Sequence, residues 1–517
     1  MTDLEVLLGL LVVVAALATA ARRVHVPPPI LMLVGGVALG FVPGLPKVAL
    51  DPQVVFLVFL PPLLYVAAVF APLRDYRANA PTIGLLAVGL VIVTAAAVAA
   101  AARALIPSLG WAQAFALGAI VAPPDAVAAT SILQRVGVPR RVIAILEGES
   151  LLNDATALVA YRLALVAAVS GSFSAADAVA SFLLIGVGGV AVGLVVGGLA
   201  AGIRLRLRDT PVSITVSILT PFVAYLAAER LALSGVLATV TAGLYIGRRL
   251  SLLSSEDRIT GGAVWQTISF LLNGLLFTLL GMQLPEIIGN LGGRQLGEVI
   301  AITAAVALVA ILVRFGWIFA AIYAPKRIRG ARRGDPPASP RAIVVVGWAG
   351  MRGAVSLAAA LALPLQFPER DLVIFITFGV ILVTLVGQGL TLPFVARGLG
   401  LVAAQDAQHE EAHARARTAE AALALLPQMR VRWPGHLPLI ERLQADYEHR
   451  VEHSEDHHDG ELGEADRELL EHRQLKQELI DAERQAARDM HARGAISDEV
   501  LRRLERDLDL AELRAGV

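Results

Sequence analysis

Stretches of about twenty apolar residues recur along this chain, and they constrain its fold more than any other feature. A helix of about 20 apolar residues crosses the roughly 30 Å hydrocarbon layer of a bilayer. Six such stretches are clear, and seven shorter or polar-interrupted candidates accompany them. We therefore predict an all-α polytopic membrane protein with about thirteen transmembrane helices. The clear stretches are residues 4–21, 53–70, 81–104, 176–203, 297–322 and 371–396, and the others are residues 29–44, 111–134, 142–169, 211–229, 234–247, 263–284 and 342–363.

The composition excludes several classes of function. The chain is 56% hydrophobic and only 17% charged, against roughly 25% charged residues in a soluble domain, so a soluble enzyme is excluded. It has no cysteine, which excludes disulfides, thiolate metal sites and cysteine nucleophiles. Lys plus Arg equal Asp plus Glu at 44 each, and no basic stripe carries aromatic residues, so we expect no nucleic-acid partner.

Loop charges predict the orientation in the membrane. If thirteen spans alternate and the N-terminus is outside, the inner loops hold nineteen Lys and Arg residues and the outer loops only four. Cytoplasmic loops carry the excess of positive charge in membrane proteins. We therefore expect an outside N-terminus and a cytoplasmic C-terminus in the cell membrane.

The last part of the chain differs from the rest. Residues 405–517 hold 26 acidic and 16 basic residues in stretches rich in Ala, Leu, Glu and Arg, which predicts a cytosolic helical tail after a membrane domain of residues 1–400. Nine of the ten histidines lie in this tail, including His453, His457 and His458. They are compatible with a pH sensor, a metal site or a solvated loop between helices.

The span at residues 111–134 contains a predicted break. Pro123 and Pro124 directly precede Asp125 near the middle of the span, and proline removes a backbone donor and clashes with the preceding turn. Irregular backbone at this depth is tolerated only where protein buries it or where it lines a cavity. An ionisable residue inside a span is costly and usually has a function, so Asp125 is a candidate functional residue.

The next span, residues 142–169, is the predicted ion-site helix. Ser150 and Asp154 are four residues apart and share one helix face, and Asn153 lies beside them. Carboxylate, amide and hydroxyl oxygens suit alkali or alkaline-earth cations. Asn153 is compatible with two roles, as an anchor for the preceding break or as a cation ligand.

The span at residues 342–363 repeats the pattern of a break with a buried charge. Three glycines surround Arg352, and glycines this dense weaken a helix. A buried arginine needs an acidic partner, and we predict Glu149. Spans 5 and 12 run in opposite directions, and paired broken helices of opposite direction are typical of an inverted-repeat secondary transporter with its site at the crossing.

Three further charged residues lie near span ends. We expect Arg162 and Arg314 to extend their long side chains toward the membrane surface rather than to take part in transport. We expect Glu229 to face water. A tuning role for Arg162 stays open, since it lies two turns from Asp154.

The chain resembles the monovalent cation:proton antiporter superfamily, in its NhaP-like sodium/proton exchanger branch related to eukaryotic NHE proteins. The resemblance covers residues 1–400, and its motifs are specific in combination. They are FLPPLLY (59–65), APPDAVAAT (122–130), GESLLNDATALV (148–159), SGVLATVTAGL (234–244), FLLNGLLF (270–277) and GWAGMRGAVSLA (347–358).

The resemblance implies thirteen spans with a moving core domain, a dimerisation domain and therefore a homodimer. It implies exchange of sodium or lithium for protons without a cofactor, by transport rather than covalent chemistry. Glu149 and Arg352 correspond to an ion pair that braces the core. A potassium/proton antiporter of the same fold and a cation channel or receptor are the alternatives.

The resemblance also assigns the ion site. Asp154 corresponds to the residue that binds cation and proton in turn, and Asn153 to the residue before it. Asp125 and Ser150 correspond to further cation ligands. An Asn-Asp pair, rather than Asp-Asp, implies electroneutral exchange.

The chain departs from the family in three places. Val66 stands where NhaP relatives often have an acidic residue, so a role of that acid in pH dependence does not transfer. Pro124 stands where many relatives have threonine, so a threonine contribution is lost. The tail after residue 400 resembles no known family.

Overall fold

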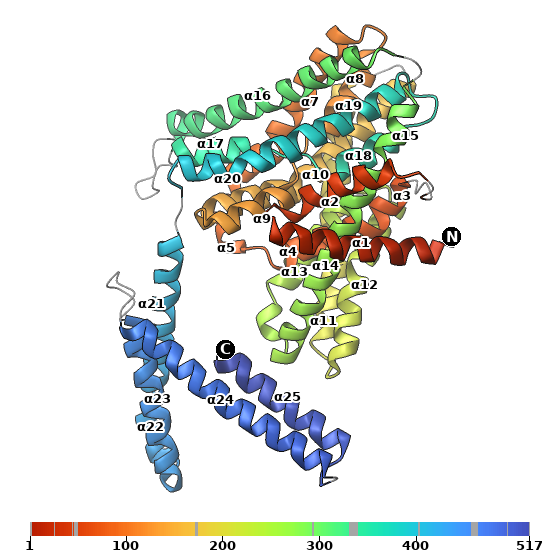
Figure 1. The fold of residues 1–517 in the computed structure, drawn as a ribbon. Helices are drawn as coiled ribbons and strands as arrows, with labels where there is room; N and C mark the ends of the chain where they lie inside the picture. Colours follow the sequence, from red (N-terminus) through yellow and green to blue (C-terminus); the bar gives the residue numbers. More distant parts are fainter. Residues whose placement is uncertain are drawn as a thin grey trace. The chain divides into compact units, whose positions relative to one another are not determined.

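The structure is a computed structural model that describes residues 3–24, 26–43, 45, 50–170, 174–291, 294–329, 340–401, 404–455, 464–493 and 495–515. These residues form helices and turns without a β-strand, and the chain divides into two compact units, Met1–Val402 and Ala403–Val517 (Figure 1). The all-α class predicted from the sequence is confirmed. Each unit is described separately below.

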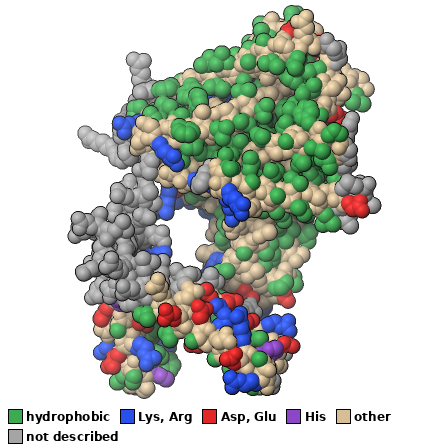
Figure 2. All heavy atoms as spheres, in the orientation of Figure 1, with side chains coloured by type: hydrophobic (Ala, Val, Ile, Leu, Met, Phe, Trp, Pro, Cys, Tyr) green, Lys and Arg blue, Asp and Glu red, His purple; other side chains and the backbone are tan. Residues whose placement is uncertain are grey.

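The first unit is a multi-pass membrane protein. Among its described residues, ten helical segments are long and apolar enough to cross a bilayer, and two further apolar helices, Pro28–Gly40 and Gly235–Gly247, are shorter. Large hydrophobic side chains also cover much of the outer face of this unit, as Figure 2 shows. A surface of this kind fits lipid rather than water. The number of thirteen spans stays a prediction.

One group of helices in this unit contains both broken helices and the predicted ion-site helix. Its members pack mainly against one another, with α8 between α7 and α10 and with α16 between α7 and α19. We call this group the core bundle. It consists of α6 (Ala80–Gly84), η2 (Leu85–Leu90), α7 (Val91–Leu105), α8 (Trp111–Val121), α9 (Ala126–Val136), α10 (Arg140–Ser170), α16 (Leu296–Arg329), α17 (Pro340–Trp348), α18 (Ala354–Leu361), α19 (Arg370–Leu382), η4 (Val383–Gln388) and α20 (Gly389–Gly398).

The other group of helices, which we call the flanking bundle, packs α14 against α2 and packs α13 against α4, α11 and α12. A short helix, α5 (Leu73–Ala78), leads from it to the core bundle. The members are α1 (Asp3–Arg23), α2 (Pro28–Gly40), α3 (Pro52–Val54), η1 (Val55–Phe59), α4 (Leu60–Val69), α11 (Ala175–Arg204), α12 (Thr210–Arg230), α13 (Gly235–Gly247), η3 (Leu250–Leu252), α14 (Ser255–Met282) and α15 (Leu284–Gly289).

Small residues explain how closely α11 and α13 pack. Gly189, Gly193 and Gly197 follow one another at four-residue spacing, so they lie on one face of α11. A Cβ atom at any of the three would overlap atoms of Ser234, Ala238 or Ala242. Membrane helices have little hydrophobic driving force between them and depend on such close contact.

The second unit is a set of amphipathic helices. Within it α21 packs against α23, and α24 packs against α25. Arg484 of α24 holds Asp509 and Glu512 of α25 at 2.9 and 2.6 Å. Its helices are α21 (Ala404–Leu423), α22 (Leu426–Arg432), η5 (Pro434–His436), α23 (Leu437–Glu455), α24 (Glu464–Ala492) and α25 (Asp498–Ala515).

The histidine cluster singled out in the sequence stays an open prediction. His457 and His458 lie outside the described residues, and so does the side chain of His453. In the part of the chain that is described, no three His, Asp or Glu side chains are grouped as a metal site would need.

Candidate functional site

The first broken helix is interrupted between Val121, where α8 ends, and Ala126, where α9 begins. Both prolines of the sequence motif lie in this gap. Asp125 is the N-cap of α9, and its carboxylate accepts a hydrogen bond of 2.8 Å from the backbone N–H of Val127. A negative group is favoured at a helix N-terminus, where N–H groups lack intrahelical partners.

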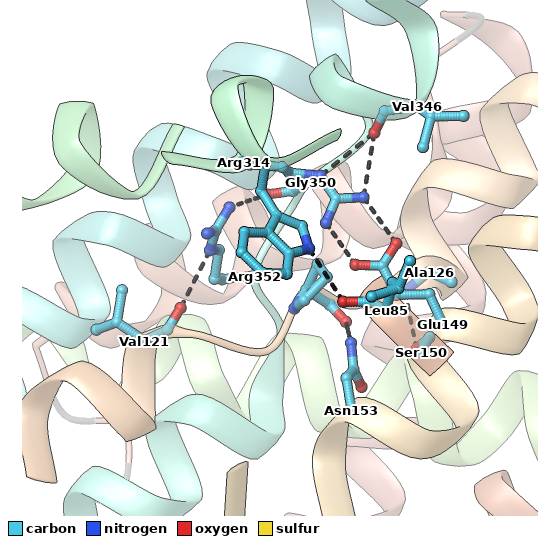
Figure 3. Close-up of polar contacts among 12 residues, drawn as sticks. Leu85, Val121, Ala126, Glu149, Ser150, Asn153, Arg314, Val346, Gly350 and Arg352 are labelled. Atoms are coloured by element: carbon cyan, nitrogen blue, oxygen red, sulfur yellow. Dashed lines mark hydrogen bonds and ion pairs between the residues drawn. The ribbon is translucent and has the colours of Figure 1, made fainter. Parts of the chain in front are cut away.

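Helix α10 holds this break in place from the side. The amide nitrogen of Asn153 donates to the Pro124 carbonyl oxygen at 2.9 Å, and the hydroxyl of Ser150 accepts from the Ala126 N–H at 3.2 Å (Figure 3). Asn153 is fully buried, and its side-chain oxygen has no hydrogen-bond partner among the described residues. Of the two roles open for Asn153, its nitrogen therefore has the geometry of an anchor.

The second broken helix is interrupted between Trp348 of α17 and Ala354 of α18, and it meets the first break directly. The Asp125 N–H donates to the Met351 carbonyl oxygen at 2.6 Å. A Cβ atom added at Gly353 would overlap the Asp125 carboxylate. The glycine thus allows the start of α18 to approach this acid, as the glycine-rich sequence indicated.

The arginine of the second break, Arg352, donates to backbone carbonyl oxygens, an interaction that the sequence did not predict. Its side chain is 1% exposed and donates to the Val121 carbonyl at 3.1 Å and to the Gly350 carbonyl (Figure 3). Val121 ends α8, so its carbonyl has no N–H four residues later to accept from. A cation at the C-terminal end of a helix also favours the helix dipole.

The predicted ion pair between Glu149 and Arg352 is wrong. Glu149 instead pairs with Arg314 of α16, whose two terminal nitrogens lie 2.5 and 2.9 Å from the two carboxylate oxygens (Figure 3). Both side chains are 1% exposed. Arg314 also donates to the Val346 carbonyl at 3.1 and 3.2 Å. In each broken helix an arginine therefore donates to a backbone carbonyl of the first half, Arg352 to Val121 and Arg314 to Val346.

One expectation about charged residues near span ends is also wrong, and a second is incomplete. Arg314 does not extend to the membrane surface, because α16 continues to Arg329 and leaves it deep in the bundle. Glu229 does not simply face water, since its carboxylate oxygens lie 2.8 and 2.9 Å from the guanidinium of Arg162. That ion pair connects α10 of the core bundle to α12 of the flanking bundle.

The two breaks and α10 border a cavity of about 430 Å³. Asp125, Ser150 and Asp154 all line it. Asn153 is not among the lining residues and contacts the Pro124 carbonyl instead. Glu147 and Val66 line it as well, and most of the other lining residues are apolar. The cavity thus brings together the three residues predicted as cation ligands.

The carboxylate of Asp154 lies in this cavity without a partner for its charge in the described part of the chain. Its side chain is 9% exposed, and among the described residues it has no hydrogen bond or ion pair. The Asp125 carboxylate lines the same cavity and repels the charge of Asp154. A buried charge without a partner is costly, so this arrangement favours the uptake of a proton or a cation.

Comparisons with known proteins agree with this geometry. The sequence profile described as Sodium/hydrogen exchanger, transmembrane, matches residues 9–398. An uncharacterized Na⁺/H⁺ exchanger of Mycobacterium bovis is 35% identical over 98% of this chain and 96% of its own length. A sodium, potassium, lithium and rubidium/H⁺ antiporter of Bacillus pumilus is 33% identical over 82% of this chain and 66% of its own length.

A solved structure shares the fold. The sodium proton antiporter MjNhaP1 from Methanocaldococcus jannaschii superposes with a TM-score of 0.61, covering 77% of this chain and 99% of that protein. The two sequences are 18% identical, so the likeness concerns the fold alone.

Proposed function

Because the chain belongs to the transmembrane sodium/hydrogen exchanger family, we propose that its antiport of cations and protons uses the carboxylate of Asp154 as the shared binding group. The protein is a secondary transporter rather than an enzyme, and the family needs no cofactor. Asp125 and Ser150 are the further cation ligands. The observation that carries this assignment is the meeting of all three side chains in one cavity at the crossing of two broken helices.

The physical basis of exchange is the cost of an unpaired buried charge. In the described part of the chain Asp154 has no hydrogen-bond or ion-pair partner, so moving it through the membrane as a bare carboxylate is unfavourable. A proton or a cation removes that cost, and the two compete for the same oxygens. Asn153 keeps the first break, and with it Asp125, in position through its bond to Pro124.

Sodium and lithium are the proposed cations, since hard oxygen ligands line the cavity. Potassium is the second candidate. The Bacillus pumilus relative, whose name includes sodium, potassium, lithium and rubidium, supports it. A channel or receptor function has no comparable support.

Exchange is electroneutral in this proposal, because one carboxylate carries either one proton or one monovalent cation. The membrane potential, at about 2.3 kcal/mol per charge per 100 mV, then contributes nothing to the cycle. Only the gradients of proton and cation drive it.

The proposed setting is the cell membrane, with the N-terminus outside and the C-terminus in the cytosol. The arginine-rich connections support this orientation by the positive-inside rule. A homodimer is proposed as well. The exposed apolar face of α11, with Val187, Val195 and Leu199 each more than 60% exposed, supports it as a surface for a second copy.

Reconstitution tests the proposal. The purified protein is placed in liposomes with a pH dye inside, and proton movement is followed after addition of sodium, lithium, potassium or calcium. We expect sodium or lithium to start proton movement in the wild type and not in Asp154→Asn. Asp446→Asn, the same change at an exposed position of the tail, is the matched control and keeps activity.

Two results would contradict the proposal. Full activity of Asp154→Asn would exclude this carboxylate as the shared site. A change in exchange rate when a potassium diffusion potential is imposed, with proton leak controlled, would exclude electroneutral exchange.

A further inference from the structure

We propose that Glu147 is a further residue of the transport path, a cation-attracting carboxylate at the entrance of the cavity that leads to Asp154. This inference rests on the proposed function of Asp154. Neither the sequence motifs nor the comparisons assign a role to Glu147. Its position, its surroundings and the charge of the cavity carry the argument.

Position is the first observation. Glu147 lies seven residues before Asp154 on the same continuous helix, α10, so the two side chains share one helix face two turns apart. Both line the cavity of about 430 Å³. Glu149, between them in sequence, points elsewhere and is paired with Arg314.

The second observation is that Glu147 is half-buried and no ion pair neutralises it among the described residues, although the side chain of Tyr76 lies near enough to interact with its charge. Within the described residues it makes no hydrogen bond and no ion pair. A structural role would give a half-buried carboxylate an arginine or backbone N–H groups to satisfy it, as Arg314 satisfies Glu149. Glu147 therefore has the surroundings of a group that interacts with mobile cations.

The third observation is the charge of the cavity. Three of the described lining residues are acidic, namely Asp125, Glu147 and Asp154, and none of those described is lysine, arginine or histidine. Most of the remaining lining is apolar, and clefts with charge of one sign and apolar walls concentrate counter-ions. The cavity therefore enriches cations before one reaches Asp154.

The direction in which the cavity opens follows from the exposed residues of its lining. Phe70 and Gln134 are exposed, and both lie near connections that the charge rule places in the cytosol, as does Arg140 at the start of α10. We infer that the cavity opens on that side, and Glu147 is nearer to that start of α10 than Asp154 is. A cation entering from that side passes Glu147 before it reaches Asp154. Glu147 is thus placed to raise the local concentration of cations and does not have to carry one across.

The expected size of the effect follows from the separation. Seven residues at 1.5 Å rise place Glu147 about 10 Å from Asp154 along the helix. At that distance the unit charge of Glu147 changes the cation occupancy at Asp154 by about two- to tenfold, depending on how much water the cavity holds. The Debye length at physiological salt is about 8 Å, so added salt weakens the effect.

The test measures cation dependence of proton movement in inside-out membrane vesicles from cells that lack other antiporters, where the proposed cytosolic side faces the medium. Glu147→Gln is expected to raise the apparent KM for sodium about two- to tenfold and to keep the maximal rate within about twofold. Glu147→Asp keeps the charge and stays near the wild-type KM. Glu298→Gln, an exposed acid far from the cavity in sequence and outside its lining, is the control and changes neither quantity.

Salt distinguishes attraction from a structural role. With an inert salt such as choline chloride raised severalfold, the ratio of the Glu147→Gln and wild-type KM values is expected to approach one. A KM unchanged at low salt, a loss of transport at saturating sodium, or a ratio independent of salt would each overturn the inference. If instead Asp154→Asn kept full activity, the proposed function itself would fail, independently of the Glu147 result.

Discussion

Replacing the buried charges of the core bundle tests the arrangement of its ion pairs. The structure pairs Glu149 with Arg314 and leaves Arg352 bound to backbone carbonyls. We therefore predict that Glu149→Leu and Arg314→Met are strongly coupled, whereas Glu149→Leu and Arg352→Met are coupled more weakly, through the longer-range attraction of the two charges. The two arginines serve as controls for each other, since both are 1% exposed and lie in the same bundle.

The expected magnitudes follow from the contacts. Arg314→Met removes two charge-assisted bonds and leaves the Glu149 carboxylate buried without a partner, which costs about 3–5 kcal/mol of stability. Replacing both partners removes that uncompensated charge, so the coupling energy should be at least about 2 kcal/mol. Arg352→Met leaves carbonyls unsatisfied at about 1–3 kcal/mol each. Glu149 contributes to this loss only through its charge at longer range, without a hydrogen bond or ion pair to Arg352.

The free energy of unfolding can be measured by SDS titration of the purified variants in mixed micelles. Each coupling energy comes from a double-mutant cycle of four proteins, namely the wild type, the two single variants and the double variant. A larger coupling for Glu149 with Arg352 than for Glu149 with Arg314 would refute the pairing described here. Transport of each folded variant then shows whether the pair only stabilises the core bundle.

Three further predictions concern the breaks and the contact between the bundles. Gly353→Ala should lower transport at least about tenfold, because the added Cβ atom overlaps the carboxylate of Asp125 in the first break. Gly202→Ala, with open space around it, is the control and should not lower transport. Normal transport by Gly353→Ala would count against the crossing geometry. Asn153→Ala should lose about 1–3 kcal/mol of stability, since a buried carbonyl loses its donor, and an unchanged SDS titration would reject the anchoring role. Arg162→Leu should cost no more than about 1 kcal/mol, because its pair with Glu229 is partly exposed, and a much larger loss in the same titration would show that the pair is more than a surface contact.

The sequence predicts the breaks well because proline and glycine act locally. Two prolines cannot continue α8, and the dense glycines around Arg352 weaken the helix there, whatever packs nearby. The shared face of Ser150 and Asp154 also follows from helix periodicity alone. Their meeting with Asp125 in one cavity could be expected, because the sequence places both breaks near the middle of their predicted spans.

The partners of buried charges could not be predicted in the same way. An ion pair depends on which helices pack together, and Glu149 is 165 residues from Arg314 in the sequence. Arg314 also lies near the end of its apolar stretch, so the extension of α16 to Arg329 is not evident from hydropathy. The Val121 carbonyl loses its helical partner at the break and accepts a hydrogen bond from Arg352 instead. This partner could be recognised only from the observed geometry of the break.

Competition between cation and proton at Asp154 is the central claim, and proton release on cation binding tests it most directly. Titration calorimetry of the purified protein with sodium, in two buffers of different ionisation enthalpy, counts the protons released for each sodium bound. We predict about one proton per sodium at a pH where the carboxylate is protonated, and neither binding nor release in Asp154→Asn. Sodium binding without proton release, or unchanged binding by Asp154→Asn, would contradict the account.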